Sequence, residues 1–204
     1  MIRTDAEAVR AYAGDAHWHD KLFLSRKLGY RCGVGVIPKT GKWIVRPAVN
    51  LDGMGRSAVI GDFDQGFAIG PGMFYSEVFE GRHISIDYVR KDGQWIQHST
   101  FEGFNTPENL IQFSRWLRVD YPYPVPDFLR GVEADHINIE VKGGKIIEVH
   151  LRGNPDPVMH DDFWPIWSAD QKPPFKEYIK IADKDDETEV GRLGFFVRDT
   201  INDY

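Results

Sequence analysis

The sequence predicts an α+β protein in which short helices precede a series of antiparallel strands. Helical spacing occurs at residues 4–13 and 20–28, and apolar runs of strand length follow one another from residue 34 onward. Tight turns at Lys91-Asp92-Gly93 and Gly143-Gly144 join neighbouring runs into hairpins, as in antiparallel sheets. With 204 residues, 42% of them hydrophobic, the chain can form one sizeable core or two small lobes that share a cleft.

The expected helices have recognisable ends. Thr4 is an N-cap candidate for the first helix, and Gly29 stands where the second would end. The segment Thr106–Val119 predicts a third helix, because a cap residue and a proline precede apolar residues on one helical face. Tyr121–Phe128 has a proline at every second position and predicts an extended connector, where a lobe boundary would fit.

Strands are expected on both sides of this connector. After it, the alternation of apolar and polar residues predicts a hairpin, a looser tail with a charged loop at residues 184–189, and a closing strand. The expected strands are Val34–Pro38, Lys42–Pro47, Arg56–Ile60, Met73–Phe79, His83–Arg90, Gln94–His98, His136–Val141, Lys145–His150 and Arg192–Val197.

Composition excludes several classes of function. The 31 acidic and 25 basic residues give a net charge of -6, which argues against a general nucleic-acid surface. A single cysteine, Cys32, excludes an internal disulfide framework and a cysteine-rich zinc site, and we expect it to be a small buried thiol. The N-terminus lacks the apolar core of a signal peptide, and no run of eighteen uncharged apolar residues occurs, so we expect a soluble, cytoplasmic protein.

The segment Trp43–Ile60 indicates an anion site. A strand with a cation before proline leads into a Gly-x-Gly-Arg turn, where the backbone N–H groups of Gly53 and Gly55 could close over a polyphosphate. Arg46 and Arg56 would add fixed positive charge, and Arg46, inside an apolar strand, needs an anion or a carboxylate partner. The alternative is an ordinary hairpin with an exposed arginine, and no Walker loop occurs in the chain.

Four segments occur in the order expected of an ATP-grasp domain, the nucleotide-binding unit of carboxylate-amine ligases and biotin carboxylase. His19–Tyr30 resembles the Asp-Lys that opens the A-lobe and its short helix. Ile44–Ile60 is similar to the family's apolar strand, Lys-Pro or Lys-Ala pair and glycine-rich flap. Tyr75–Ile96 resembles the segment that links the lobes and lines the adenine, and Ile137–Pro157 resembles the metal-bearing hairpin that ends in Glu-x-Asn-x-Arg.

This resemblance implies two small α+β lobes whose antiparallel sheets clamp a nucleotide cleft. Residues 1–79 would form the N-terminal helices and the A-lobe with its flap, and residues 80–204 the B-lobe with the metal-binding hairpin and the C-terminal tail. The implied cofactors are ATP and Mg²⁺, with Mn²⁺ as an alternative. The implied reaction activates a small-molecule or peptide carboxylate as an acyl-phosphate for attack by an amine or similar nucleophile, without nucleic-acid or membrane partners.

By the same resemblance, Lys21 and Arg46 would neutralise phosphate oxygens while the flap from Gly53 to Arg56 closes over them. The main chain of Glu77–Phe79 would line the adenine, with an apolar contact from Phe79, and His83 would face the ribose or phosphates. Two alternatives remain open: Lys21 could be a solvated helix lysine, and His83 an exposed strand histidine.

For the metal, Glu148 is the expected ligand, because it ends an apolar strand and His150 follows on the same face. Asn138 or Glu140 on the partner strand would complete the ligand set, unless this is the polar face of a solvated hairpin. A histidine here either shifts the selectivity toward Mn²⁺ or weakens the site.

Arg152 and Asn154 would, by resemblance, orient the acyl-phosphate or the γ-phosphate. His160, Asp161 and Asp162 form a further polar cluster that we expect to be a loop.

Two substituted positions keep other functions open, as does the earlier hairpin strand, which offers His136, Asn138 and Glu140 in place of one obvious inward acid. Arg46 replaces the usual lysine, and His150 stands where the metal-binding asparagine is expected. The chain could therefore be a weakened ATP-grasp protein that binds a nucleotide or a protein partner, or a non-enzymatic, β-rich assembly module. The residues before the first motif are too few for the separate N-terminal domain of such ligases, which leaves room for a homodimer or a partner subunit that supplies it.

Overall fold

The computed structural model describes residues 2, 4–49, 51, 57–105, 110, 112–182 and 191–198. Its helices are α1 (Asp5–Ala11), η1 (Ala13–His19), α2 (Lys21–Lys27) and η2 (Asp127–Leu129). Its strands are β1 (Cys32–Gly33), β2 (Gly41–Pro47), β3 (Val59–Phe63), β4 (Met73–Ser76), β5 (His83–Lys91), β6 (Gln94–Asn105), β7 (Phe113–Arg118), β8 (His136–Lys142), β9 (Lys145–His150), β10 (Asp162–Pro165), β11 (Tyr178–Ile181) and β12 (Phe195–Arg198).

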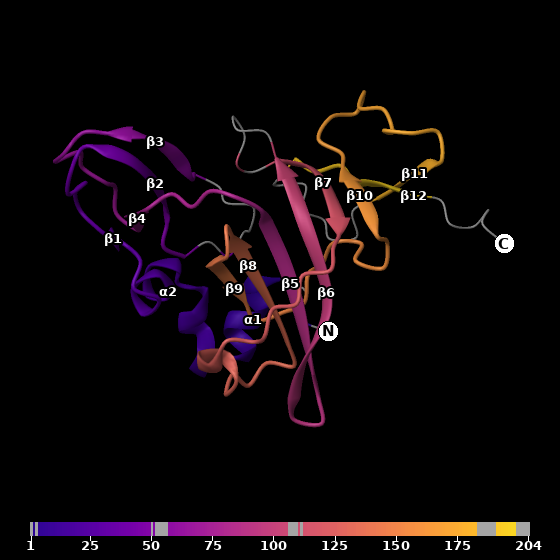
Figure 1. Ribbon diagram of the computed structural model, residues 1–204, viewed down its shortest axis with the longest axis horizontal. Coiled ribbons are helices and arrows are strands. Elements are labelled where there is room, and N and C mark those ends of the chain that lie inside the picture. Colours follow the sequence, from indigo (N-terminus) through magenta and orange to yellow (C-terminus); the bar gives the residue numbers. More distant parts are fainter. Residues whose placement is uncertain are drawn as a thin grey trace.

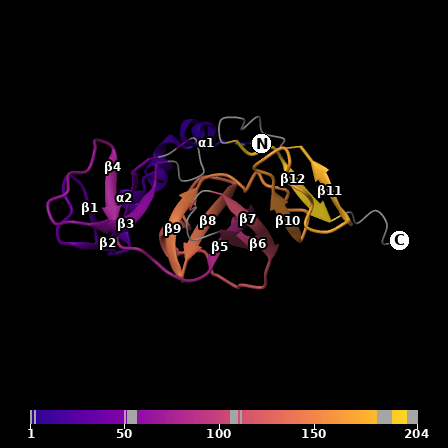
Figure 2. The ribbon, with the colours of Figure 1, turned by 90° about the horizontal axis from the view of Figure 1, so that it is seen from above.

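The strands form two antiparallel sheets, which confirms the α+β prediction. The smaller sheet has the order β1-β4-β2-β3, and the larger has the order β11-β12-β10-β7-β6-β5-β8-β9. Figure 1 shows the small sheet at one end of the molecule and β10 to β12 at the other, with the central strands between them. The view from above shows the same succession (Figure 2). Among the described residues, no helix is long and apolar enough to cross a membrane.

The helices α1 and α2 begin where the sequence predicts, but α1 ends at Ala11 instead of residue 13, and the 3-10 helix η1 was not predicted. Thr4 caps α1 in a reciprocal capping box with Glu7, and Asp20 caps α2 by accepting hydrogen bonds from the first-turn N–H groups. Gly29 follows α2 with φ +73°, the left-handed conformation that glycine adopts most easily. Both η1 and α2 pack against β9, an edge strand of the large sheet.

The main hydrophobic cluster lies between these helices and one face of the central strands. It includes Trp18 and Leu24 from the helical segment, and the connector at residues 121–128 packs against it. Tyr88 donates a hydrogen bond to the carbonyl of Tyr123, which fixes this extended connector, as predicted, over the core. Strand residues in the cluster are Ile84, Ile86, Tyr88, Ile137, Ile139, Val141, Ile146 and Val149.

The predicted helix over Thr106–Val119 is wrong, because its second half is strand β7. β6 extends to Asn105 instead of ending at His98, so its free edge pairs with Phe113–Arg118. The rings of Phe113 and Trp116 then cover Gly103, where a Cβ atom would collide with both. Sheet pairing thus overrides a helical spacing that was only local.

Other strand predictions also need correction. The strand predicted at Arg56–Ile60 is β3, at Val59–Phe63. Residues 34–38 form no strand beyond a single bridge from Val36 to Ala68, because Gly35 takes φ +85° and turns the chain. The region 154–174, predicted as loose, contains β10, and β11 follows; β12 begins at Phe195, later than expected. These strands add the edge β11-β12-β10 beyond β7.

The proline-rich connector joins β7 to β8, which lie in the same sheet, so it does not separate the two sheets. Residues 77–82 make that connection, from β4 in the small sheet to β5 in the large one. A lobe boundary near residue 79 stays a prediction.

The β8–β9 turn holds this connection in place. Gly143 donates its backbone N–H to the Arg82 carbonyl over 2.9 Å, and its Cα lies where a Cβ on Gly81 would touch it. A Cβ on Gly143 would in turn collide with the Glu80 carbonyl oxygen. The close approach of two backbones therefore requires glycine at position 143.

We expect Gly143→Ala to destabilise the protein more than Gly144→Ala. Both glycines have positive φ, so alanine costs about 1–2 kcal/mol at either position. Only position 143 adds the collision with Glu80, worth about 1–3 kcal/mol more, since Gly144 has open space around it. Urea unfolding of the two variants measures the difference, and equal midpoints would show that the 77–82 connection is not held by this turn.

Candidate functional site

The central strands of the large sheet carry polar side chains on the face opposite the hydrophobic cluster. Ser85 of β5 is paired with Glu140 of β8, and Glu140 with Glu148 of β9. Asn138 is paired with His150 in the same hairpin. Directly paired residues share a sheet face, so strand alternation alone gathers these groups side by side.

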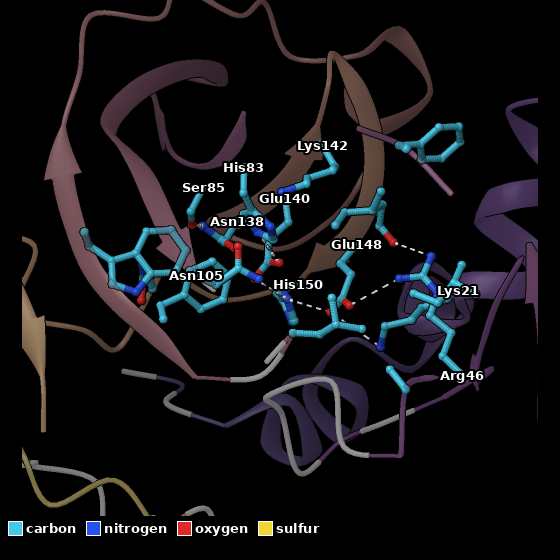
Figure 3. Close-up of a pocket in the computed structure, with 18 of the residues that line it drawn as sticks. Lys21, Arg46, His83, Ser85, Asn105, Asn138, Glu140, Lys142, Glu148 and His150 are labelled. Atoms are coloured by element: carbon cyan, nitrogen blue, oxygen red, sulfur yellow. Dashed lines mark hydrogen bonds and ion pairs between the residues drawn. The ribbon is translucent and has the colours of Figure 1, made fainter. Parts of the chain in front are cut away.

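These side chains line a cavity of about 230 Å³ that also receives residues of the small sheet (Figure 3). Three predicted site residues, Gly53, Gly55 and Arg56, lie outside the described residues. The other eleven line this cavity: Lys21, Arg46, Glu77, Phe79, His83, Asn138, Glu140, Glu148, His150, Arg152 and Asn154.

Two buried cations meet one carboxylate at the small-sheet side of the cavity. Lys21 Nζ lies 3.4 Å from Glu148 Oε2, and Arg46 Nη1 lies 3.6 Å from Glu148 Oε1. Arg46 also donates to the Ile147 carbonyl and has its guanidinium over the Phe74 ring. Lys21 and Arg46 are 6% and 7% exposed, so neither is a solvated surface cation.

The last residue of β9, His150, is held by an acid from helix α1. Both oxygens of Asp5 lie 3.0 Å from His150 Nδ1, and Asp5 also binds the Arg152 guanidinium, with Nε 2.9 Å from Oδ1. Asp5 is 2% exposed. His150 Nε2 faces the cavity acids, 3.6 Å from Glu148 Oε2 and 3.8 Å from Glu140 Oε1.

Two more side chains on this face are fixed by partners. His83 Nε2 lies 3.0 Å from Glu140 Oε2, so His83 is a buried, paired residue and not an exposed strand histidine. The Asn138 amide nitrogen donates to Ser85 Oγ and Asp87 Oδ1, which leaves the Asn138 oxygen as its one available ligand atom.

Burial and charge shift the pKa values of this cluster in opposite directions. Burial would lower the pKa of His150, but the charge and hydrogen bond of Asp5 raise it to about 9. Burial lowers the pKa of His19 to about 4, against the attraction of Asp5. Burial would raise the pKa of Glu140, yet hydrogen bonds from His150 and His83 hold it well below its usual range.

The residues present fit a divalent cation at one place. Ligand atoms of Glu140, Glu148 and His150 all lie within 4.8 Å of one another, at the edge of the cavity. Asp5, His19 and His150 form a second such group. Asp5 and His19 do not line the cavity, so the first group is the better candidate.

The remaining predicted residues lie at the two ends of the cavity. Arg152 is held by Asp5, while Asn154 accepts the backbone N–H of Asp156 and donates its own N–H to Asp87. At the other end, Glu77 turns its carboxylate to Arg31, 3.2 Å away, and the Phe79 ring contacts Tyr30.

The polar cluster at residues 160–162, expected to be a loop, leads into strand β10, and its two acids pair with arginines of β7. Asp162 starts β10 and forms a double hydrogen bond with Arg115 of β7, and Asp161 pairs with Arg118. These ion pairs join the C-terminal strands to the rest of the sheet.

Sequence reasoning missed Asp5 and the aromatic wall formed by Phe113, Trp116 and Trp167. An acid in the first turn of a helix is a common feature, so nothing local marked Asp5. The wrong prediction of a helix over residues 106–119 prevented us from predicting the wall, because a helix would have placed Phe113 and Trp116 differently.

We expect the free energy of unfolding to be greatest near pH 6.5. The raised pKa of His150 contributes stability that is complete below about 6.5 and is lost as the pH rises through 9. The lowered pKa of His19 contributes stability that is complete above about 6.5 and is lost as the pH falls to 4. Urea unfolding at pH 5, 6.5 and 9 measures the loss of stability on both sides of this maximum. His19→Gln should reduce only the loss at acid pH. A free energy of unfolding that rises steadily to pH 9 would contradict this prediction.

Comparisons with known proteins agree with this architecture. No protein-family model matches the sequence, and no curated protein sequence matches it. Solved structures do resemble it. An ATP-grasp superfamily protein from Archaeoglobus fulgidus matches with a TM-score of 0.53 and 15% identity, covering 97% of this chain and 68% of that protein.

N5-carboxyaminoimidazole synthetase from Staphylococcus aureus is also similar. Its complex with ADP gives a TM-score of 0.58 at 9% identity, covering 91% of this chain and 68% of the enzyme. A second structure of the same enzyme gives a TM-score of 0.52 at 8% identity, covering 89% of this chain and 67% of the enzyme. At such identities the likeness concerns the fold, and the chain therefore has an ATP-grasp-like α+β fold.

Proposed function

We propose that this protein is an ATP-dependent ligase that uses the cavity between its two sheets. The observation that carries the proposal is the convergence of two buried cations, Lys21 and Arg46, with three candidate metal ligands in that one cavity. The ATP-grasp-like fold supports it, as does the ADP bound to the similar synthetase from Staphylococcus aureus.

The two cations suit a triphosphate. At present Glu148 neutralises both of them, in the way that phosphate oxygens would. Arg46 Nε is buried and has no hydrogen-bond partner among the described residues, which costs about 1–3 kcal/mol until an acceptor arrives. A nucleotide phosphate would supply that acceptor and release Glu148 toward a metal ion.

Glu140, Glu148 and His150 would hold the divalent cation, Mg²⁺ or Mn²⁺, which screens the phosphate charge during transfer. The main chain of Glu77–Phe79 would contact the adenine. Arg152, fixed by Asp5, would orient the transferred phosphoryl group together with Asn154.

The reaction that we propose has two steps. A substrate carboxylate oxygen attacks the γ-phosphorus, the bond to the β-phosphate oxygen breaks, and an acyl-phosphate and ADP form. An amine then attacks the acyl carbon, loses a proton and displaces inorganic phosphate. Arg46 and Lys21 are buried, so their attraction for the negative charge of the phosphates would be stronger than in bulk water.

A second candidate is a nucleotide-binding protein without ligase activity. It is favoured by the two positions that depart from the family pattern, Arg46 and His150. In the described structure the His150 imidazole lies between Asp5 and the cavity acids, where a protonated ring could replace a cation.

Mg·ATP is expected to raise the melting temperature by about 5–10 °C at a hundredfold excess over its Kd. Arg46→Ala and Lys21→Met should each reduce this shift, measured against the variant's own ligand-free melting temperature. Arg130→Ala is the matched control, because Arg130 forms an exposed ion pair with Asp127 outside the cavity. An absent shift in the wild type would remove both nucleotide-based functions and leave the assembly module.

Turnover should separate the two remaining candidates. With Mg·ATP, a panel of carboxylates and hydroxylamine as the amine, a ligase forms hydroxamate and ADP in equal amounts. Glu148→Gln should lower this rate at least about 10–100-fold, as for other losses around metal ligands, whereas Glu102→Gln, which alters an ion pair outside the cavity, should not. Tight Mg·ATP binding without either product would favour the protein without ligase activity.

A further inference from the structure

The Asp5 carboxylate fixes how His150 presents its ring. Both Asp5 oxygens lie 3.0 Å from His150 Nδ1, so Nδ1 carries a proton and donates it to the carboxylate. An incoming cation would displace the proton from Nε2 and bind the lone pair there, while Nδ1 keeps its hydrogen bond to Asp5. A histidine that ligates a metal commonly donates its other ring N–H to a carboxylate, which orients the ring and raises its basicity.

His150 Nε2 points at the two cavity acids. It lies 3.6 Å from Glu148 Oε2 and 3.8 Å from Glu140 Oε1, and Figure 3 shows these three side chains converging. One ion can therefore touch one nitrogen and two carboxylate oxygens. The other group of candidate ligands, Asp5, His19 and His150, lies away from the cavity, because neither Asp5 nor His19 lines it.

We propose that Asp5 is a positioning residue that makes His150 a true metal ligand, and that the resulting site of one nitrogen and two carboxylates prefers Mn²⁺ to Mg²⁺. The proposal rests on the proposed function, because it concerns the cation of the same cavity.

The preference follows from the donor atoms. Mg²⁺ favours a shell made of oxygen alone and binds imidazole poorly, whereas Mn²⁺ accepts carboxylates and also an imidazole nitrogen. An asparagine at position 150 would offer oxygen and would need no acceptor on the far side. A histidine needs one, and α1 supplies it with a side chain that is 2% exposed.

Mn²⁺ itself is the probe. The full chain is mixed with Mn²⁺ and a non-hydrolysable ATP analogue, and electron paramagnetic resonance measures the fraction of Mn²⁺ that is bound. Competition by added Mg²⁺ then measures the preference for Mn²⁺ over Mg²⁺. Pulsed spectra should show coupling of bound Mn²⁺ to a ¹⁴N nucleus from His150. His150→Asn should remove that coupling and reduce the preference for Mn²⁺ by about tenfold or more.

The role of Asp5 is tested by placing Asp5→Asn in the wild-type protein and in the His150→Asn variant. Asp5→Asn should weaken Mn²⁺ binding about 10–100-fold and reduce the ¹⁴N coupling, but it should change nothing further once His150→Asn is present. A purely structural role would weaken binding equally in both. Circular dichroism and urea unfolding show whether the variants fold. If Asp5→Asn does not fold, the ¹⁴N coupling of the wild type and its loss in His150→Asn still decide whether His150 is a ligand.

The outcomes distinguish this proposal from the proposed function. Nucleotide binding with Mg²⁺ preferred, or with bound Mn²⁺ that shows no ¹⁴N coupling, would overturn the role of Asp5 and His150 and leave the ligase proposal intact. Failure of the protein to bind either the nucleotide analogue or Mn²⁺ would overturn both.

Discussion

One carboxylate joins the three parts of the molecule that form the cavity. Glu148 belongs to edge strand β9 of the large sheet, and its oxygens contact Lys21 at the start of α2 and Arg46 near the end of β2. The small sheet has its own hydrophobic cluster, around Ile37 and Trp43, apart from the main one. The position of Arg46 over the cavity therefore depends on charge, because an unpaired buried guanidinium would be strongly unfavourable.

The cavity is close to electrically balanced in the absence of ligands. Among the described residues that line it, four acids oppose five permanent cations, so neither a free metal ion nor a free anion meets a large excess of opposite charge. A nucleotide with its cation changes this, since phosphate can replace Glu148 as the partner of the two cations. Buried ion pairs contribute little net stability compared with apolar packing, so such a network on a sheet face is better explained by ligand binding. The acids are Glu77, Glu140, Glu148 and Asp156, and the cations are Lys21, Arg46, Lys142, Arg152 and Arg192.

The sequence predicted the parts that depend on local pattern. The cap at Thr4, the helix end at Gly29, and the β8–β9 hairpin with its alternation are properties of neighbouring residues, and the hairpin alone placed Glu140, Glu148 and His150 on one face. The errors concern pairing between distant segments. β7 exists because β6 offers it an edge, and local spacing in residues 106–119 cannot contain that information. Asp5 was missed for the same reason, since 145 residues separate it from His150.

Each of the two departures from the ATP-grasp pattern has its own structural partners. The fork of Arg46 reaches both the Glu148 carboxylate and the Ile147 carbonyl, two acceptors that a single ammonium group could not address with the same geometry. His150 has Asp5 behind it. A site that had simply lost its function would have no reason to retain a buried acid on a separate helix for one changed ligand. The paired placement of Asp5 and His150 therefore argues for a cation site of altered preference, and against the loss of one.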